Sequence, residues 1–523
     1  MIIRDISGGA MKITKGPEAG HLVKHTFLGW VQQGVALGVG LVLLPYMVWQ
    51  LGAEKYGVLL IVQLFSISGL LAYTDIGLYN ASTRYLTQFY AQGNFSDFRN
   101  LLMTSFVIFL FIGTLCALFV FTFSELLFSR VFQIPQEYAE QSRIGLTIYA
   151  VSFLFNFPAF VLKAFYSSVQ DLVTLRAWEI IERVVYGVVI FVFLIFSNSI
   201  VGFVIAEQVV GSIFLLIFVV VAASRYEGLF TLNPCYFSWS SLRNIWPLSW
   251  QVFLNRLFYV FYQKMPEIFV AYFLGVKDMA HFAIIKKIPT ALKSLQAGAN
   301  TAVFAAAAFW DSLGMQDKLC KLMLRSARYC YLFLTPVSAF IFVFSEEILR
   351  IWVGEEYVFL ANVLRGYLSW QYVMFLVGLI NAMLTRREQY VQVLPYNVVG
   401  GVVLIAVMVS TIGMFGLWSV IGGLLANGIV IAYGTVKVQQ DWLKISYREL
   451  YRYVVAVPMV CAGVAGLGVF ALTRVYIKPE GLVELMALFG CVCLGYVATV
   501  YRLGLDGNER QGLEKILRRV MKG

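Results

Sequence analysis

The chain has 523 residues, of which 60% are hydrophobic and 13% are charged. Soluble domains are about 45–50% apolar and about 25% charged, so this composition excludes a water-soluble globule. A membrane-spanning helix takes about 20 residues, and most stretches between the apolar runs are too short for a folded domain. Any chemistry is therefore expected among the helices.

The charged and sulfur-containing residues exclude several other classes of protein. The net charge of +11 comes from basic residues spread over many short loops, which is typical of membrane orientation rather than of nucleic-acid binding. Seven cysteines and three histidines are too scattered to predict a disulfide framework or a metal site. The first 26 residues lack the apolar region of a cleaved signal peptide. We expect no nucleic-acid partner and no cofactor.

Apolar runs of helical length follow one another along the chain and predict an all-α polytopic membrane protein with about fourteen transmembrane helices. The runs are residues 27–49, 57–78, 101–123, 144–165, 177–196, 200–223, 247–274, 279–308, 328–345, 358–383, 391–412, 415–436, 452–473 and 482–501. Their length disfavours a β-barrel, whose strands show about ten residues of alternation. With both termini inside, 26 Lys and Arg residues face the cytoplasm and 7 face outward, as the positive-inside rule expects.

A weak internal repeat divides the chain into two halves. Three pairs recur in order at offsets that fall from 223 to 214: Leu51-Gly52 and Leu274-Gly275, Gln170 and Gln389, and Gly202 and Gly416. Six helices per copy give both copies the same orientation, which predicts a parallel pseudo-two-fold repeat. The predicted parts are a cytoplasmic N-terminal segment (1–26), an N-lobe (27–223), a cytoplasmic linker (224–246), a C-lobe (247–437), two extra helices (452–501) and a basic cytoplasmic tail (502–523).

Polar side chains gather in the seventh and eighth predicted helices, where ionisable residues are costly unless they are paired or line a wet cavity. In the eighth helix, one face holds Lys286, Thr290, Lys293, Gln296 and Asn300, with Lys287 beside it. Lys293 lies about 10 Å deeper than Lys286. The seventh helix contributes Gln251, Asn255, Arg256, Tyr259, Gln263, Lys264 and Glu267. These residues predict a hydrated cationic cavity; the alternative is a set of buried salt bridges such as Lys264 with Glu267.

The first half is less cationic. Glu179 and Arg183 have the spacing of an ordinary ion pair on one helix. Glu207 has no partner in its own turn and is a candidate protonatable site. Asp75, nine residues before Arg84, either forms an Asp–Arg pair at a helix end or belongs to an ion site.

Several motifs resemble the Wzx-type polysaccharide flippases of the MOP superfamily. In the first half these are Leu51-Gly-Ala-Glu-Lys-Tyr56-Gly57 and Asp75-Ile-Gly77-Leu-x-Asn80-x-x-x-Arg84-Tyr. In the second half they are Phe273-Leu-Gly275, Phe282-Ala-Ile-Ile-Lys-Lys-Ile288 and Ile351-Trp352-Val-Gly354-x-x-Tyr357. The chain departs from the family in two places. Met279-Ala280 stands where the first half has Tyr56-Gly57. The acidic residue expected late in the seventh helix is represented only by Glu267, which follows a proline.

The resemblance implies two six-helix lobes that move a polyprenyl-pyrophosphate-linked oligosaccharide across the cytoplasmic (inner) membrane by alternating access. The pathway implied is cell-surface polysaccharide synthesis, such as O-antigen and lipopolysaccharide, with other polysaccharide-assembly proteins as further partners. For the pyrophosphate we expect Arg256, Lys264, Lys286, Lys287 and Lys293, with Arg84 added from the family motif. For the sugars we expect Gln251, Asn255, Gln263, Gln296, Asn300, Tyr259 and Tyr262.

The chain has no Walker-type phosphate loop, so ATP hydrolysis by this chain is excluded as the energy source. We expect proton or sodium coupling through Glu267, Glu207 or Asp75; the alternative is downhill flipping, with Glu267 only neutralising Lys264. A multidrug exporter of organic cations is the competing function. A membrane glycan polymerase or ligase would need a large external loop or a carboxylate and histidine constellation, so no enzymatic activity is expected.

Overall fold

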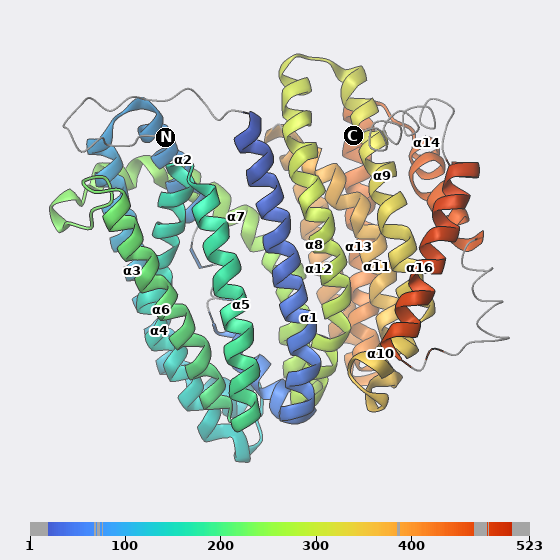
Figure 1. Cartoon of the computed structure of the whole chain (residues 1–523), viewed down its shortest axis with the longest axis horizontal. Coiled ribbons are helices and arrows are strands. Elements are labelled where there is room, and N and C mark those ends of the chain that lie inside the picture. Colours follow the sequence, from blue (N-terminus) through green and yellow to red (C-terminus); the bar gives the residue numbers. More distant parts are fainter. Residues whose placement is uncertain are drawn as a thin grey trace. The chain divides into compact units, whose positions relative to one another are not determined.

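The computed structural model describes residues 19–66, 69–70, 74–75, 77–383, 387–464, 479 and 481–504. In this part of the chain nearly every residue is helical and there is no strand (Figure 1). Nine of the described helices are long and apolar enough to cross a membrane: Leu28–Leu64, Phe95–Leu126, Gln136–Ser168, Ile200–Arg225, Gln316–Val343, Glu355–Asn381, Val391–Phe415, Leu417–Leu443 and Leu482–Arg502. The predicted all-α polytopic membrane fold is confirmed.

The helices follow the predicted order, and most extend past the predicted apolar runs. They are α1 (Ala19–Leu64), α2 (Leu78–Gln92), α3 (Phe95–Leu126), α4 (Gln136–Ser168), α5 (Leu172–Phe196), α6 (Ile200–Arg225), α7 (Trp239–Phe269), α8 (Val276–Ser312), α9 (Gln316–Val343), α10 (Ser345–Trp352), α11 (Ala361–Met383), α12 (Arg387–Phe415), α13 (Leu417–Leu443), α14 (Tyr447–Leu450) and α16 (Leu482–Thr499). Helices α5, α7 and α8 are also long, and they hold the charged residues described below.

The second predicted span, residues 57–78, is wrong as a continuous helix. Helix α1 ends at Leu64, and a new helix, α2, begins at Leu78. Turn-forming residues explain the break: the N–H of Gly69 donates to the carbonyl of Ser66, and Gly77 has a φ of 68°. A Cβ at Gly77 would lie 2.4 Å from the carbonyl oxygen of Ser249 in α7. Only glycine allows both this backbone conformation and this close approach.

The repeated Leu-Gly pair has the same structural role in both copies. Gly52 (φ 73°, ψ 161°) and Gly275 (φ 85°, ψ −172°) adopt nearly the same backbone conformation, one that is essentially restricted to glycine. Each lies where one helical segment passes into the next. The second pair differs, because Gln170 has a left-handed φ of 61° whereas Gln389 lies inside α12.

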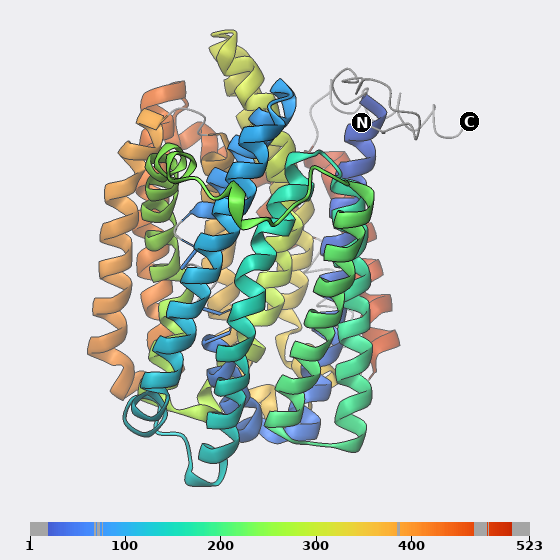
Figure 2. The ribbon, with the colours of Figure 1, turned by 90° about the vertical axis from the view of Figure 1, so that its left-hand side faces the viewer.

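The chain forms two compact units. Unit 1 comprises residues 1–43, 64–124 and 141–256, and unit 2 comprises residues 44–63, 125–140 and 257–523. Figure 2 looks at unit 1, whose helices α3 to α6 run roughly parallel to one another. Aromatic side chains fill the interior of unit 1, where Phe98, Phe153, Phe157 and Phe165 are fully buried.

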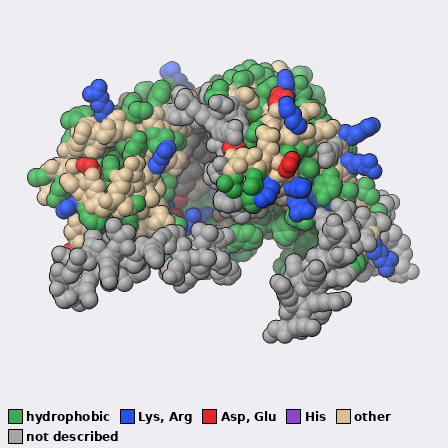
Figure 3. Space-filling model, turned by 90° about the horizontal axis from the view of Figure 1, so that it is seen from above, with side chains coloured by type: hydrophobic (Ala, Val, Ile, Leu, Met, Phe, Trp, Pro, Cys, Tyr) green, Lys and Arg blue, Asp and Glu red, His purple; other side chains and the backbone are tan. Residues whose placement is uncertain are grey.

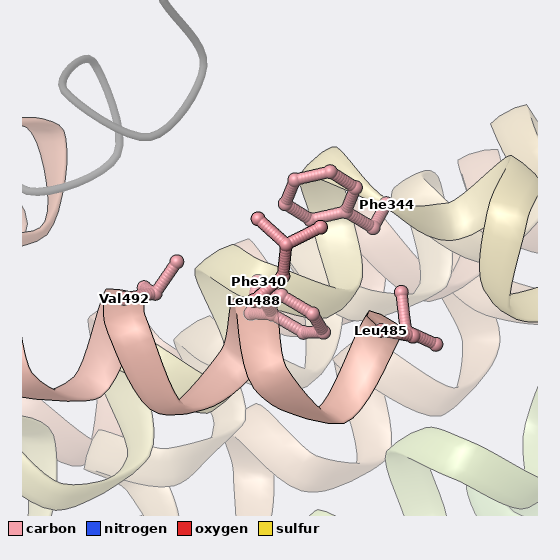
Figure 4. Close-up of a cluster of buried hydrophobic side chains, with 5 residues drawn as sticks. All are labelled: Phe340, Phe344, Leu485, Leu488 and Val492. Atoms are coloured by element: carbon pink, nitrogen blue, oxygen red, sulfur yellow. The ribbon is translucent and has the colours of Figure 1, made fainter. Parts of the chain in front are cut away.

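In unit 2, the last described helix packs on α9. Phe340 and Phe344 at the end of α9 contact three side chains of α16, Leu485, Leu488 and Val492 (Figure 4). All five are buried. Apolar contacts between α9 and α16 therefore hold the C-terminal helix on this unit.

Candidate functional site

A triad of charged side chains joins α7 and α8 in unit 2. The Nζ of Lys264 lies 3.2 Å from Oε2 of Glu267, and Lys286 donates to the other carboxylate oxygen. Lys286 also lies 3.4 Å from the carbonyl oxygen of Gln263. The side chains of Lys264, Glu267 and Lys286 are 18%, 12% and 20% exposed. The pairing of Lys264 with Glu267, which was the alternative to a cationic cavity, is present in the structure, and Lys286 joins it.

The chain reversal at Gly275 positions this triad. Helix α7 ends in the π-helical turn Val270–Leu274, and α8 begins directly after Gly275. Glu267 precedes the glycine by eight residues and Lys286 follows it by eleven. At about 1.5 Å per residue, two antiparallel helices place such residues at similar heights. Because Lys264 precedes Glu267 by three residues, it lies on the same face of α7.

The residues of the predicted polar face of α8 have two kinds of surroundings, and Gln296 and Asn300 contact α11. Lys287 and Lys293 are partly buried, and Thr290 is exposed. Gln296 is 4% exposed and donates to the carbonyl of Phe375 in α11 at 2.5 Å. Asn300 lies 3.5 Å from the carbonyl of Gly378 in the same helix. Gln296 and Asn300 are therefore contacts between α8 and α11, and we leave them out of the sugar site.

Part of the predicted site lies outside the described side chains. The backbone of α7 is helical throughout. The side chains of five predicted residues fall outside the described part: Gln251, Asn255, Arg256, Tyr259 and Tyr262. Their roles stay predictions.

The family-motif residues of unit 1 occupy the start of α2. Asp75 is 1% exposed, and its Oδ1 accepts the backbone N–H of Gly77 at 3.3 Å. Its main-chain carbonyl accepts the N–H of Leu78 at 2.8 Å. Asp75 therefore holds the beginning of α2, which favours a structural role. Arg84 is exposed on the same helix.

Glu207 takes part in a polar network between α4 and α6. The hydroxyl of Tyr149, which is 1% exposed, donates to Glu207 at 2.5 Å. About two turns further along α4, the amide of Asn156 donates to Gln208 at 3.0 Å and to Ser152 at 3.2 Å. Glu207 was expected to have no partner in its own turn of α6, and its hydrogen-bond donor Tyr149 lies on the neighbouring helix α4.

A second charged cluster, which the sequence did not predict, lies in unit 1 on α1, α4 and α5. We call it the unit 1 cluster: Gln32, Lys163, Arg176 and Glu179. Oε2 of Glu179 lies 3.3 Å from Nη1 of Arg176 and accepts a hydrogen bond from the amide of Gln32 at 2.8 Å. The other carboxylate oxygen, Oε1, lies 3.6 Å from Nζ of Lys163. Nη1 of Arg176 also donates to Gln32 at 2.5 Å.

The expected pairing of Glu179 with Arg183 is therefore wrong. Arg183 instead lies over the ring of Tyr186, 5.3 Å from its centre, where a cation is attracted to the aromatic face. A weak signal for the observed arrangement was present. Arg176 precedes Glu179 by three residues, as Lys264 precedes Glu267, and Lys163 is a second nearby cation in the preceding helix.

Basic side chains stand out on both units. Figure 3 shows Lys and Arg side chains that project from the face of each unit drawn there. The predicted topology places the beginning of α5, in unit 1, and the beginning of α9, in unit 2, on the cytoplasmic side. Within the described ranges, no group of three or more His, Cys, Asp or Glu residues could hold a metal ion.

Comparisons with known proteins bear on the fold. The MatE family model matches residues 39–190, and no curated protein sequence matches the chain. A multidrug resistance MATE family transporter of the MOP superfamily, in an inward-facing conformation, has a TM-score of 0.63 at 14% identity, covering 80% of this chain and 95% of that one. The lipid II flippase MurJ, inward closed, has a TM-score of 0.65 at 11% identity, covering 91% and 98%.

A third solved structure with the same fold is described by the polarity of its own binding pocket. A MOP superfamily transporter from Pyrococcus furiosus, described as having a binding pocket of reverse polarity, has a TM-score of 0.56 at 14% identity, covering 82% of this chain and 96% of that one. Identities this low show the fold alone. This chain therefore has the same all-helical fold as these solved structures.

Proposed function

We propose that this protein is a flippase for a lipid-linked oligosaccharide whose lipid carries a pyrophosphate. One observation carries the proposal: between residues 279 and 300, α8 holds Lys286, Lys287 and Lys293 and not one acid. On the neighbouring helix, Glu267 pairs with Lys286 and with Lys264. A cation excess in a membrane helix favours an anionic ligand.

The chemistry of the substrate explains why such a region would be needed. Moving a pyrophosphate and a hydroxyl-rich glycan through hydrocarbon costs several kcal/mol for each polar group that loses its hydrogen bonds. Lysine side chains can replace water around the phosphates. Lys287 and Lys293 are the proposed phosphate contacts, because both are partly buried on the stretch of α8 that holds no acid. The solved structure of a lipid II flippase with the same fold supports the proposal.

For energy coupling we propose Glu207 rather than Glu267. Two ammonium groups already neutralise Glu267, so a proton or sodium ion would have to displace a lysine. Glu207 accepts a hydrogen bond from Tyr149, a neutral donor. A carboxylate beside a neutral donor can take up and release a proton as its surroundings change.

A multidrug exporter is the second candidate. The match of residues 39–190 to the MatE model favours it, as does the fold of a multidrug resistance transporter. Organic cations would be repelled by the lysines of α8. The two functions therefore make opposite predictions about the charge of the substrate.

A flipping assay separates the two candidates. In reconstituted liposomes, the protein should move a fluorescent polyprenyl-pyrophosphate oligosaccharide between leaflets and leave ethidium, an organic cation, unmoved. Transport of ethidium alone would overturn the proposal. An imposed proton or sodium gradient should raise the flipping rate of the native protein but not that of Glu207→Gln. Equal rates in all gradients would exclude coupling.

The proposed location is the cytoplasmic membrane with both termini inside. A cysteine placed at Val353, in the loop after α10, should react with an impermeant thiol reagent added to intact cells. A cysteine placed at Lys515 should react only after permeabilisation. The background is a variant whose seven native cysteines are replaced by serine. The reverse pattern would invert the predicted topology.

A further inference from the structure

The unit 1 cluster has more hydrogen-bond donors than its protein partners use. Arg176 donates only through Nη1, and within the described part of the chain its Nε and Nη2 have no protein partner. The Nζ of Lys163 is 3.6 Å from Glu179, beyond hydrogen-bond distance. The two cationic side chains are 39% and 43% exposed. Both can contact a further anion without leaving the cluster.

The cluster lies near the ends of its two helices. Lys163 precedes the last residue of α4 by five residues, and Arg176 follows the first residue of α5 by four. At 1.5 Å per residue, both lie within about 8 Å of the turn that joins these helices. The predicted topology places this turn on the cytoplasmic side. This is the depth of lipid headgroups in the inner leaflet.

We propose that Lys163 and Arg176 bind the phosphate of a lipid headgroup at this end of unit 1, and that Glu179 is the counter-ion which this phosphate displaces. The inference rests on the proposed function and adds the place where the substrate phosphate first binds. An arginine fork matches two phosphate oxygens, and charge-assisted hydrogen bonds of this kind are strong. Gln32 holds the guanidinium in place through its Oε1.

The charge balance of the neighbourhood fits this exchange. Glu182, on the same helix, interacts electrostatically with Lys163 and Glu179 of the cluster and with its neighbour Arg183. Glu182 and Arg183 contribute one charge of each sign. With Glu179 in place, three cations face two carboxylates, so the region keeps a single positive charge. A pyrophosphate that takes the place of Glu179 brings more negative charge and more acceptor oxygens, because each of its two phosphates carries at least one charge and two non-bridging oxygens, which is as much as one carboxylate.

Binding of geranylgeranyl diphosphate to the full-length protein in detergent tests the proposal. Arg176→Gln and Lys163→Gln should each raise the Kd about tenfold. Arg225→Gln is the matched control, because Arg225 is 44% exposed at the same end of unit 1 and pairs with Asp171 at 3.1 Å. It should leave the Kd unchanged. An unchanged Kd in both Arg176→Gln and Lys163→Gln would overturn the proposal.

The Glu179→Gln variant gives the sharpest result. If Glu179 is a displaceable counter-ion, its neutralisation should lower the Kd about three- to tenfold. If the cluster only holds the helices together, the same change should weaken binding or leave it unaltered, which would overturn the proposal. Thermal unfolding shows whether each variant is folded. Lys163→Gln keeps the test decisive should Glu179→Gln fail to fold, because Lys163 is the most exposed member.

Two competitor arms identify the source of the phosphate. Inorganic pyrophosphate and phosphatidylglycerol should displace the probe only at concentrations at least tenfold above that of geranylgeranyl diphosphate. Equal competition by pyrophosphate would assign the site to a soluble phosphate and overturn the headgroup assignment. Equal competition by phosphatidylglycerol would assign the site to bulk lipid and overturn its assignment to the substrate phosphate. Because the probe carries no glycan and the assay involves no transport, binding with this pattern can hold even if glycan flipping fails.

Discussion

The two charged clusters have the same ratio of charges and different surroundings. Each holds one glutamate between two cations, and in each a basic residue precedes the glutamate by three positions: Arg176 and Glu179 in unit 1, Lys264 and Glu267 in unit 2. In unit 2 the three side chains are 12–20% exposed. In unit 1 the cations are about 40% exposed. The same charge ratio thus gives a closed ion triad in one unit and an open one in the other.

This difference separates two roles that sequence spacing cannot distinguish. A closed triad has its charges mutually satisfied, so removing one member leaves another buried and uncompensated. An open pair is partly solvated, and its net contribution to stability is small. The open cluster is therefore the better ligand site, and the closed one the better structural link between α7 and α8.

The largest expected effect is on the stability of unit 2. Glu267→Gln leaves Lys264 and Lys286 close together without a carboxylate, and should destabilise the fold by about 3 kcal/mol. Thermal unfolding in detergent measures the loss. The control is Glu54→Gln, because Glu54 pairs with Lys277 at 3.4 Å with side chains 39% and 65% exposed. It should cost less than about 1 kcal/mol. If Glu267→Gln and Glu54→Gln lost the same free energy of unfolding, burial would not distinguish the two ion pairs.

A triple variant sharpens this result. Replacing Glu267 by Leu and both Lys264 and Lys286 by Met removes the charges together and keeps apolar volume. Such replacement of a buried ion network is often neutral or stabilising. The triple variant should therefore unfold at a higher temperature than Glu267→Gln. If it unfolds lower, the triad has a role beyond mutual neutralisation.

The next effect concerns transport. Lys293→Gln should reduce flipping of the fluorescent lipid-linked glycan at least tenfold, about 1.4 kcal/mol in activation free energy, with little change in unfolding temperature. Lys277→Gln, on the same helix and 65% exposed, is the matched control and should flip normally. Full activity of Lys293→Gln would exclude this lysine from the phosphate path.

Much of the fold follows from the sequence, because apolar runs of about 20 residues leave few alternatives to membrane helices. The break between α1 and α2 was missed because Ser66, Gly69 and Asp75 lie within an otherwise apolar run. Their turn-forming tendency competes with hydropathy, and hydropathy alone predicted a helix. The Leu-Gly repeat, in contrast, corresponds to a shared backbone conformation at Gly52 and Gly275.

The site was less predictable, because helical spacing defines a face but not the neighbour that this face meets. Gln296 shares a face with Lys293 in the sequence, yet it meets α11. Glu179 has Arg183 four residues later, yet it contacts Arg176 and two other helices. In both cases the partner is distant in sequence, and a tertiary contact takes precedence over the local one. The pairing of Lys264 with Glu267 could be given as an alternative from the sequence because it is local.

The smallest expected effect is the stability change on opening the unit 1 cluster. Arg176→Gln should destabilise the protein by only about 0.5 kcal/mol, because partly exposed ion pairs gain little over their solvated state. The loss should shrink further between 0.05 and 0.5 M NaCl, since salt screens exposed charges far more than buried ones. Glu267→Gln should keep most of its larger loss over the same range. The measurement is the unfolding temperature of both variants at each salt concentration. A salt-independent loss of several kcal/mol in Arg176→Gln would show that the unit 1 cluster is as closed as the triad in unit 2, and the distinction between the two would fail.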